Sequence, residues 1–511
     1  MIYDAASLGM LEIAADLCVI GSGAGGAMAA MVAAEAGLNV VVLEAGGFFS
    51  PDDMTQREDA MLPQLYWDAA GRTTADRNIR IHQGKGVGGS TLHNLNLCKR
   101  ISKQLLLDWR RDFGLKHLPP EKWALLYSEV EQLLEVAEVS REHWNSHNLI
   151  LEKGVQTLGW RGGSLSHNRS GCVGSGFCEI GCAFDAKNNA AKVLIPRAIA
   201  AKAQVLIHCQ AVRVTHENDR VVGVSAVAID AKSHEPLHKI TIRAPRICLA
   251  ASATATPALL HRSGLARMPG AVGDTLRIHP AVVAAGDFAQ PVRAWQGIPQ
   301  TYECTEMLEF ADSPPKSAAH SKRIWIVPAF GHPMGTATMM PGMGSQHREL
   351  MQRYEHLAVL TAMLHDTTAG RVRPDGDQTF SVEYVPNAHD RRDLRLGLKA
   401  SAQLLLAAGA RRVIIPLLKP LILRNMSELA LIDELKLLPG EIGLTAVHPM
   451  GSVPMGDDTQ RFAVDSRGQF ANMRGLWIAD GSLFPTSVGV PPQLSIYAMG
   501  LHVGRALVAD G

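Results

Sequence analysis

A stretch near the N-terminus, residues 16–44, constrains the fold of this chain more than any other part of the sequence. It consists of a short apolar run, a glycine turn, an alanine-rich segment with apolar residues at helical spacing, and a second apolar run that ends at Glu44. This order predicts a strand, a tight turn, a helix and a second buried strand. The glycines of the turn, Gly21, Gly23 and Gly26, form the pattern G-x-G-x-x-G.

Each residue of this motif has a physical role in binding a dinucleotide. Gly21 permits the tight turn, Gly23 lets the backbone approach a pyrophosphate, and Gly26 lets the helix pack closely on the strand. The N-terminus of the helix offers free N–H groups and the positive end of its dipole to the phosphate. Glu44 lies at the distance at which a carboxylate binds an adenosine ribose. The stretch therefore predicts a dinucleotide-binding domain, although the glycine motif alone does not distinguish NAD from FAD.

Length and composition predict a globular enzyme of two intertwined domains. The chain has 511 residues, of which 47% are hydrophobic and 19% charged, and its formal net charge is +1. This length exceeds that of a usual single domain, and the near-neutral charge gives no electrostatic support for nucleic-acid binding. No uncharged apolar run reaches the ~18 residues that a transmembrane segment needs.

The first residues, MIYDAASLGMLEIAAD, give an expectation about location. They contain no basic region, twin arginine or cleavage site, so we expect no export on a signal of the chain's own. The cytoplasm is the expected location. Export on a partner subunit and a peripheral position at a membrane remain alternatives.

The rest of the chain alternates between helical and strand patterns. Residues 102–160 have apolar side chains at helical spacing, and further helices are expected at 188–202, from near Pro257 onward, and at 391–409. Strands are expected over five further segments: 205–214, 221–229, 240–250, 323–328 and 380–385.

Two loops are expected between these elements. Residues 84–89 contain four glycines, which suit either positive φ angles or close contact with a flat, extended cofactor. Residues 332–344, HPMGTATMMPGMG, are expected to form either a flexible lid or a packing segment. The apolar segment 413–423 is expected to be core, with a membrane or partner surface as the alternative.

Four separated motifs resemble those of the glucose–methanol–choline (GMC) flavoprotein oxidoreductases. They are GSGAGG…LEAGG, GKGVGGSTLHN, AASATATPALLHRSG and HPMGSVPMG…GLWIADGSLFPTSVGV, and the resemblance extends from about residue 14 to the end. It implies that the chain binds FAD in an extended conformation and oxidises a hydroxyl group by hydride transfer to flavin N5. The electrons would then pass to oxygen, a quinone or a protein acceptor.

The resemblance also implies the fold class, which is α/β with an α+β second domain. We expect a discontinuous Rossmann-like FAD-binding domain built from residues 1–100, 172–284 and 440–511. A helical segment would occupy residues 101–171. Residues 285–439 would form the substrate-binding domain, on a mostly antiparallel sheet.

Cofactor contacts carry over from the family position by position. The residues that match the family's ADP-binding residues are Gly21, Gly23, Gly26 and Glu44. Those that match its flavin loop are Gly88, Gly89, Ser90, His93 and Asn94. Val212 matches the residue whose backbone meets the adenine, and Asp480 and Gly481 match the pair near the pyrophosphate and ribityl chain. His93 has the spacing of a histidine that some members link covalently to the flavin 8α-methyl carbon, and a hydrogen-bonding histidine is the alternative.

His448 matches the active-site histidine of the family and is the expected catalytic base, since a neutral imidazole can accept the hydroxyl proton. The family usually places a second His or Asn at the position of Pro491, which has no side-chain donor or acceptor. His448 therefore works with another partner, for which His279, His365 and His389 are candidates, or works alone, or the chemistry is altered.

Cys172, Cys178 and Cys182 lie together in a glycine-rich segment. Three thiols cannot all pair as disulfides, and zinc normally takes four ligands, of which this segment supplies three. Thiolates are the usual ligands of iron–sulfur centres, and some dehydrogenases that resemble this chain hold a three-iron cluster in a similar segment. The alternatives are a cluster that passes electrons to a protein partner and a purely structural loop.

The expected substrate is a bulky, hydrophobic alcohol. The substrate domain is apolar and rich in methionine, and residues 278–300 resemble the branch that contains long-chain alcohol and sterol oxidases. A sugar or polyol is the second choice. Two rival functions remain: a lyase in which FAD is structural, suggested by Pro491, and a subunit of a larger electron-transfer complex.

Overall fold

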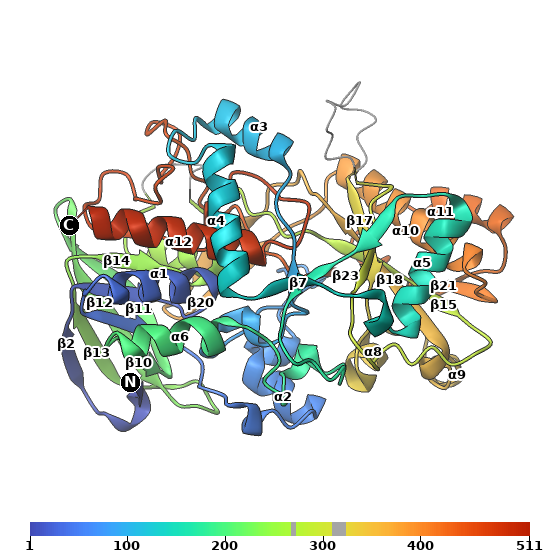
Figure 1. Cartoon of the computed structure of the whole chain (residues 1–511), viewed down its shortest axis with the longest axis horizontal. Helices are drawn as coiled ribbons and strands as arrows, with labels where there is room; N and C mark the ends of the chain where they lie inside the picture. Colours follow the sequence, from blue (N-terminus) through green and yellow to red (C-terminus); the bar gives the residue numbers. More distant parts are fainter. Residues whose placement is uncertain (267–271, 309–322, 511) are drawn as a thin grey trace.

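The computed structural model describes residues 1–266, 272–308 and 323–510. The chain forms two domains that lie side by side (Figure 1), one built on a parallel sheet and the other on a mostly antiparallel sheet. The fold class expected from the sequence is confirmed.

The parallel sheet of the first domain is assembled from segments that are distant in the sequence. In spatial order its strands are β1 (Ile2–Asp4), β10 (Gln204–Ile207), β4 (Val40–Leu43), β3 (Leu17–Ile20), β14 (Ile247–Leu249) and β24 (Leu476–Ile478). Every residue of β3, β4, β14 and β24 is buried. Helices cover such sheets on both faces, which explains the continuous apolar runs in the sequence.

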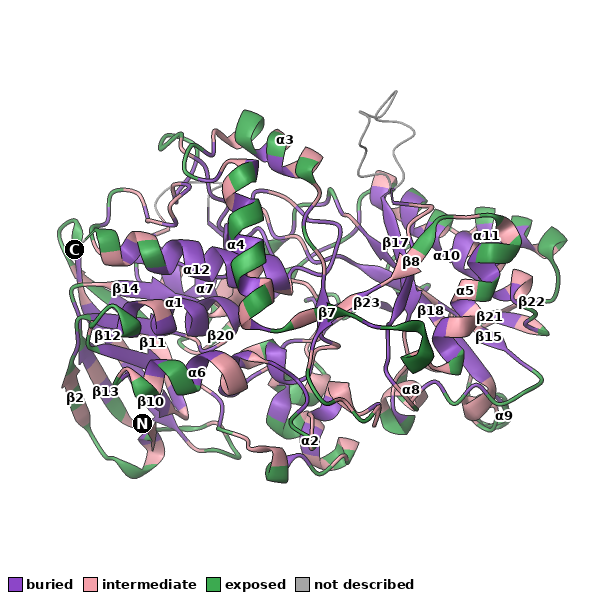
Figure 2. Ribbon diagram, viewed as in Figure 1, coloured by how far each residue is buried: buried purple, intermediate pink, exposed green. Residues whose placement is uncertain are grey.

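Helices α1 (Ala24–Glu35) and α12 (Gln493–Ala509) pack against each other over this sheet, where both are largely buried (Figure 2). Their close approach depends on glycine, because a Cβ on Gly500 would lie 2.5 Å from the carbonyl oxygen of Gly25. Helix α6 (Ala190–Ala200) also packs against α1. The N-terminal end of α1 is thereby fixed in position.

A second sheet of the first domain contains the predicted meander. Its order is β11 (Cys209–Glu217), β12 (Arg220–Ile229), β13 (Pro236–Arg243) and β2 (Leu11–Ala14). The apolar run predicted as one strand at 240–250 is divided, because β13 ends at Arg243 and β14 joins the parallel sheet.

Among the described residues, the second domain is built on a sheet of nine strands. Along the main path they are β22 (Leu421–Leu423), β21 (Arg412–Ile415), β15 (Ala281–Asp287), β18 (Leu357–Leu364), β17 (Ile324–Pro328), β16 (Tyr302–Cys304) and β8 (Gly162–Ser164), while β23 (Leu444–Ala446) and β5 (Ile79–Ile81) branch from β15. Among the strand pairs of this sheet in the described ranges, only β23–β5 is parallel. Helices α10 (Ala388–Ala407) and α5 (Ser146–Leu158) pack against this sheet and against each other.

Several elements cross the expected domain limits. β15 spans the limit set at residue 284, and β5, β8 and β23 join the second sheet from segments assigned elsewhere. Three of these strands have only three residues each, too few to show an alternating pattern. Residues 101–171 contain the expected helices, α3 (Lys103–Phe113), α4 (Pro120–Leu133) and α5, but also three short strands.

The remaining elements connect these layers. They are α2 (Glu58–Leu65), α7 (Ser252–Arg262), α8 (Pro333–Met339), α9 (Ser345–Met351), α11 (Ala430–Asp433), β6 (Leu97–Cys98), β7 (Val136–Glu138), β9 (Ser166–Asn168), β19 (Arg371–Asp375) and β20 (Thr379–Glu383). Two expectations were wrong. α8 occupies the predicted loop at 332–344, with Pro333 in its first turn, and α7 begins at Ser252, so Pro257 lies inside the helix rather than at its start.

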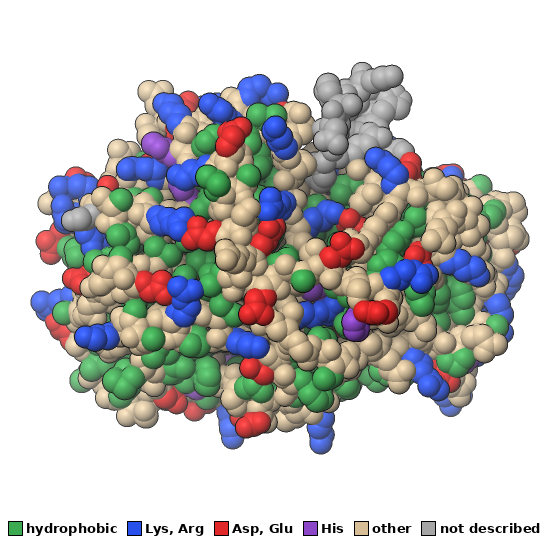
Figure 3. All heavy atoms as spheres, in the orientation of Figure 1, with side chains coloured by type: hydrophobic (Ala, Val, Ile, Leu, Met, Phe, Trp, Pro, Cys, Tyr) green, Lys and Arg blue, Asp and Glu red, His purple; other side chains and the backbone are tan. Residues whose placement is uncertain are grey.

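The surface shows no field of a single sign on the face drawn in Figure 3, where basic and acidic side chains are interspersed. Within the described part of the chain, every helix is too short or too polar to cross a bilayer.

Candidate active site

One cavity of about 1210 Å³ extends from the first glycine loop to the second sheet. Its wall includes the residues between β3 and α1, the second glycine loop, and segments around His448 and Asp480. The cavity therefore lies where the two domains meet. Gly21, Gly23, Glu44, Gly89, Ser90, His93, Asn94, His448, Asp480 and Gly481 line it, whereas Gly26, Gly88 and Val212 do not.

The glycines of the first loop differ in what a side chain at each position would meet. Gly21 has a φ of +98°, and a Cβ there would lie 2.3 Å from the carbonyl oxygen of Ala250. Gly26 packs directly on the loop, because a Cβ at this position would lie 2.0 Å from the carbonyl oxygen of Gly21. Gly23 differs, because a Cβ there would meet no protein atom within 4 Å. Gly23 caps α1 without a side chain, so free N–H groups face the cavity, as binding of a pyrophosphate requires.

Glu44 follows β4 and is buried at the cavity wall. Its carboxylate accepts hydrogen bonds from the Ser22 hydroxyl (2.6 Å) and from the backbone N–H groups of Gly46 (2.9 Å) and Gly86 (3.1 Å). Glu44 thus ties the two glycine loops together. These contacts hold the acid rigidly beside the space expected for the adenosine ribose.

The second glycine loop packs on the first. A Cβ on Gly89 would lie 3.0 Å from the Cα of Gly23, so only a small residue fits between the loops. Gly88 has a φ of +104° and faces Ala191 of α6 rather than the cavity. The Ser90 hydroxyl accepts a hydrogen bond from the Gly84 N–H at 2.9 Å.

His93 is buried in the wall of the cavity at the end of this loop. Its ring centroid lies 3.9 Å from that of Tyr66, and its Nε2 has no hydrogen-bond partner among the described residues. Burial, with smaller effects of Lys187 and His82, lowers the pKa of His93 well below its usual range. His93 is therefore neutral.

Asn94 and Asp480 make hydrogen bonds that hold polar parts of the site together, while Val212 lies at an irregular point of a nearby strand. The Asn94 amide donates to Gln493 Oε1 at 2.6 Å, at the start of α12. Asp480 accepts from the Thr256 hydroxyl (2.6 Å) and from the N–H groups of Ser252 and Ser482. Val212 is the bulged residue of β11, skipped in the pairing with β12, so its N–H is outside the ladder.

His448 lies directly after β23, and His279 lies just before β15. These strands pair antiparallel at Ala281 and Thr445, which places the two histidines opposite each other. The two Nδ1 atoms are 3.2 Å apart, with the rings nearly perpendicular. His448 lines the cavity, whereas His279 is buried behind it.

Burial lowers the pKa of His448 to about 3. Burial also lowers the pKa of His279 well below its usual range, with further effects of His448 and His365. Loss of hydration disfavours the imidazolium form of both residues. The pair is therefore neutral at physiological pH.

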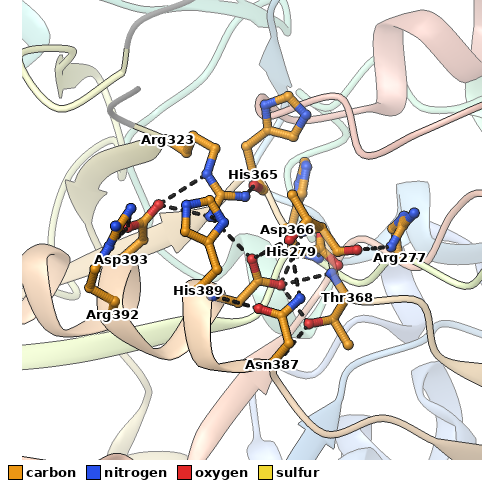
Figure 4. A network of polar contacts seen from close by, with 12 residues as sticks. Arg277, His279, Arg323, His365, Asp366, Thr368, Asn387, His389, Arg392 and Asp393 are labelled. Atoms are coloured by element: carbon orange, nitrogen blue, oxygen red, sulfur yellow. Dashed lines mark hydrogen bonds and ion pairs between the residues drawn. The ribbon is translucent and has the colours of Figure 1, made fainter. Parts of the chain in front are cut away.

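The structure places one of the three candidate partners in direct contact with His448. His279 makes the direct contact, whereas His389 Nδ1 lies 3.0 Å from Arg323 Nη2, within the polar network of Figure 4. His365 is a neighbour of His279 and Arg323. Pro491 lines the cavity.

The three clustered cysteines are free thiols that line one small, separate cavity with Arg169 and Lys187. Lys187 Nζ is buried and donates to the carbonyl oxygens of Cys178 (3.0 Å), Leu92 and Asn94 (2.6 Å). It thus joins the cysteine segment to the flavin loop. As placed, no group of three or more His, Cys, Asp or Glu side chains among the described residues is arranged to hold a metal ion.

The part of the cavity next to α8 and the second sheet is mostly apolar. Side chains from α8 and the second sheet line it: Met339, Met340, Leu357, Val359, Met363 and Ile414. Helix α8 forms one wall, and its first N–H groups, on Met334 and Gly335, donate to the Glu58 carboxylate of α2 at 2.7 and 2.8 Å.

Sequence reasoning missed several polar residues of the cavity, and three of them have contacts or charges that bear on the site. Glu58 fixes α8, Gln493 holds Asn94, and Glu179 lines the wall near Tyr66, with a pKa that burial raises to about 7. None lies in a motif of its own. For Glu179 the proximity of Cys178 was an available signal, because that segment was already expected near the flavin.

Comparisons with known proteins identify the family to which the sequence is similar. The sequence models of the N- and C-terminal parts of the GMC oxidoreductase family match residues 24–281 and 366–500. An uncharacterized GMC-type oxidoreductase of Mycobacterium tuberculosis is 34% identical over 501 residues, covering 97% of this chain and 76% of the relative. A long-chain-alcohol oxidase of Arabidopsis thaliana is 28% identical over 522 residues, covering 97% of this chain and 67% of the oxidase.

Solved structures share the fold. A pyridoxine 4-oxidase from Mesorbium loti superposes with a TM-score of 0.69 at 17% identity, over 96% of this chain and 98% of the oxidase. A formate oxidase from Aspergillus oryzae gives a TM-score of 0.70 at 16% identity, over 99% of both chains.

Fold, site and sequence matches together define an FAD-dependent oxidoreductase of the alcohol oxidase and dehydrogenase class. The chain belongs to the GMC oxidoreductase family. The residues present fit FAD, because a bare helix N-terminus, a rigid acid and two glycine loops face one long cavity.

Proposed function

We propose that this enzyme oxidises the CH–OH group of a bulky, hydrophobic alcohol, with His448 contacting the hydroxyl and accepting its proton. Bound FAD would accept the hydride at N5. The observation that carries the proposal is the position of His448, a neutral imidazole in the wall of the cavity between the flavin loop and the apolar pocket. Proton transfer by such a positioned group typically accelerates a reaction by about 10²–10⁴.

The apolar pocket supports the substrate class. Its methionine and aliphatic side chains suit an alkyl or ring substrate, because burial of apolar surface contributes roughly 25 cal/mol per Å². The name of the Arabidopsis relative, a long-chain-alcohol oxidase, agrees with this choice.

The test is an alcohol panel under anaerobic conditions. The purified enzyme should show flavin absorption, and a long-chain primary alcohol should bleach it, whereas a sugar or polyol should do so more slowly. A flavoprotein that no alcohol bleaches would support the lyase alternative and contradict the proposal.

We further propose a covalent bond between His93 and the flavin. Its support is the free Nε2 of a buried, neutral histidine in the cavity wall. After acid precipitation the flavin colour should stay with the wild-type protein and leave a His93→Ala variant. Colour in the supernatant of both proteins would exclude the bond.

A second candidate function is that of an iron–sulfur dehydrogenase. It would differ from an oxidase in passing its electrons to a protein partner instead of to oxygen. It is favoured by three free thiols around one cavity beside two cationic side chains, which would offset the charge of a cluster, although the thiols as placed do not form a ready metal site. Iron near three per chain, together with acid-labile sulfide at about four per chain, in anaerobically purified protein would support it. Iron near zero, with rapid peroxide formation, would favour oxygen as the acceptor.

A further inference from the structure

The contact between His279 and His448 determines where each ring carries its hydrogen. His279 Nε2 accepts a hydrogen bond from the backbone N–H of Gly489 at 2.8 Å, so this nitrogen must hold a lone pair. A neutral imidazole has one protonated nitrogen, which places the hydrogen of His279 on Nδ1. His279 Nδ1 therefore donates to His448 Nδ1 across the 3.2 Å contact.

The same reasoning fixes His448. Because its Nδ1 accepts from His279, a neutral His448 carries its hydrogen on Nε2. The charged forms do not fit. An imidazolium at His279 would point an N–H at the N–H of Gly489, and one at His448 would place two hydrogens between the Nδ1 atoms. The lowered pKa values of both residues agree with two neutral rings.

The backbone around His279 is built to hold this orientation. His279 has a φ of +51°, a left-handed conformation that a non-glycine residue adopts only at an energetic cost. The buried Asp366 carboxylate stabilises it by accepting from the N–H groups of Ile278 (3.1 Å) and His279 (3.3 Å) and from the Tyr384 hydroxyl (2.7 Å). Figure 4 shows His279 beside Asp366 within the wider polar network.

We propose that His279 is a positioning residue that keeps the hydrogen of His448 on Nε2, so that the resting enzyme presents an N–H donor to the oxygen of a bound alcohol or carbonyl compound. The inference rests on the proposed function, in that it takes the cavity beside His448 as the substrate site. His279 is thus a partner of His448, where Pro491 offers no side-chain donor or acceptor, but it acts from behind His448 and does not line the cavity.

This arrangement adds a condition to the proposed base. His448 cannot accept a proton on Nε2 while that nitrogen carries a hydrogen. Three proton shifts must come first: His448 Nε2 releases its hydrogen to water, His279 passes its Nδ1 hydrogen to His448 Nδ1, and His279 Nε2 takes a hydrogen from water. The bond from Gly489 to His279 must then break. The side chain that selects between hydrogen-bond donor and proton acceptor is thus His279.

The test is ¹⁵N NMR of the holoenzyme labelled in its histidine rings, which reports directly which ring nitrogen is protonated. The chain has 20 histidines, so His448→Gln identifies the resonances of His448, and His143→Gln, at an exposed site, is the matched control. We expect His448 with hydrogen on Nε2 and His279 with hydrogen on Nδ1. A His448 with hydrogen on Nδ1, or a mixture of both forms, would overturn the proposal.

Two variants of His279 test whether this residue keeps the hydrogen of His448 on Nε2. His279→Leu removes the donor, and His448 should then lose the pure Nε2–H signature. His279→Gln retains one donor and one acceptor, and should restore that signature. An unchanged His448 signal in His279→Leu would overturn the role of His279. If His279→Leu does not fold, the spectra of the wild type and of His279→Gln still test the proposal. Failure of the proposed function is recognised separately, by a flavin that no alcohol reduces while the histidine signals remain as expected.

Discussion

At the scale of single residues, burial sets the chemistry of the cavity. His448, His279 and His93 are all kept neutral because the protein withdraws them from water. Neutral rings can donate through one nitrogen and accept through the other, which a charged ring cannot do. The acid Glu179 is affected in the opposite sense, since burial favours its protonated, uncharged form.

The raised pKa of Glu179, about 7 against an ordinary 4.5, predicts a pH-dependent stability. The folded protein holds this proton more tightly than the unfolded chain, so the free energy of unfolding falls as pH rises from about 4.5 to about 7. Because the Gln side chain does not titrate, Glu179→Gln should not show this loss of stability as the pH rises. Between pH 5 and pH 8, denaturant unfolding should show the variant gaining about 2 kcal/mol relative to wild type. An equal gain by Glu142→Gln, an exposed control, would contradict the assignment to Glu179.

At the scale of elements, two glycines of the first loop have different roles, one in packing and one in leaving space for the cofactor. Gly26→Ala drives a Cβ into the backbone of Gly21 and should destabilise the fold by about 1–3 kcal/mol. Gly23→Ala meets no protein atom and should leave the unfolding transition within about 1 kcal/mol. It should nonetheless weaken FAD binding at least tenfold, because the new methyl group enters the space of the pyrophosphate. Normal FAD affinity in Gly23→Ala would contradict the placement of the cofactor.

Helix α8 depends on a contact from the other domain. The Glu58 carboxylate caps its first two N–H groups, and hydrogen bonds to a charged acceptor contribute about 1.5–3 kcal/mol. Glu58→Ala should therefore speed proteolytic cleavage within α8 and raise KM for a long-chain alcohol several-fold. For Glu58→Gln, which keeps one acceptor, the cleavage rate and the KM should lie between those of the wild type and those of Glu58→Ala. Unchanged cleavage in Glu58→Ala would show that α8 is held by its packing alone.

Local elements could be predicted where the sequence carries a local pattern. The strands and helix of residues 16–44 are detectable because glycine spacing and apolar runs act within a few residues. Strand β8 and helix α8 were missed because one has three residues and the other a composition typical of loops. The partnership of His279 and His448 depends on strand pairing across 169 positions and on a left-handed backbone, neither of which has a local signal.

At the scale of the whole molecule, the site exists only because the two domains share strands and loops. β5, β15 and β23 form one branch of the second sheet, and His279 and His448 flank two of these strands. The first domain supplies the glycine loops, His93 and Asp480 to the same cavity. The resemblance to a family predicted this shared site, whereas composition and periodicity alone predicted only two domains.

The central claim, alcohol oxidation at a flavin beside His448, is tested most directly by anaerobic stopped-flow reduction of the bound flavin with a long-chain primary alcohol. The wild-type flavin band should bleach completely, with one equivalent of alcohol for each flavin. His448→Gln should bind the same amount of FAD and bleach about 10²–10⁴ times more slowly. An equal bleaching rate in His448→Gln would contradict the role of His448, and a wild-type flavin that no alcohol reduces would contradict the account as a whole.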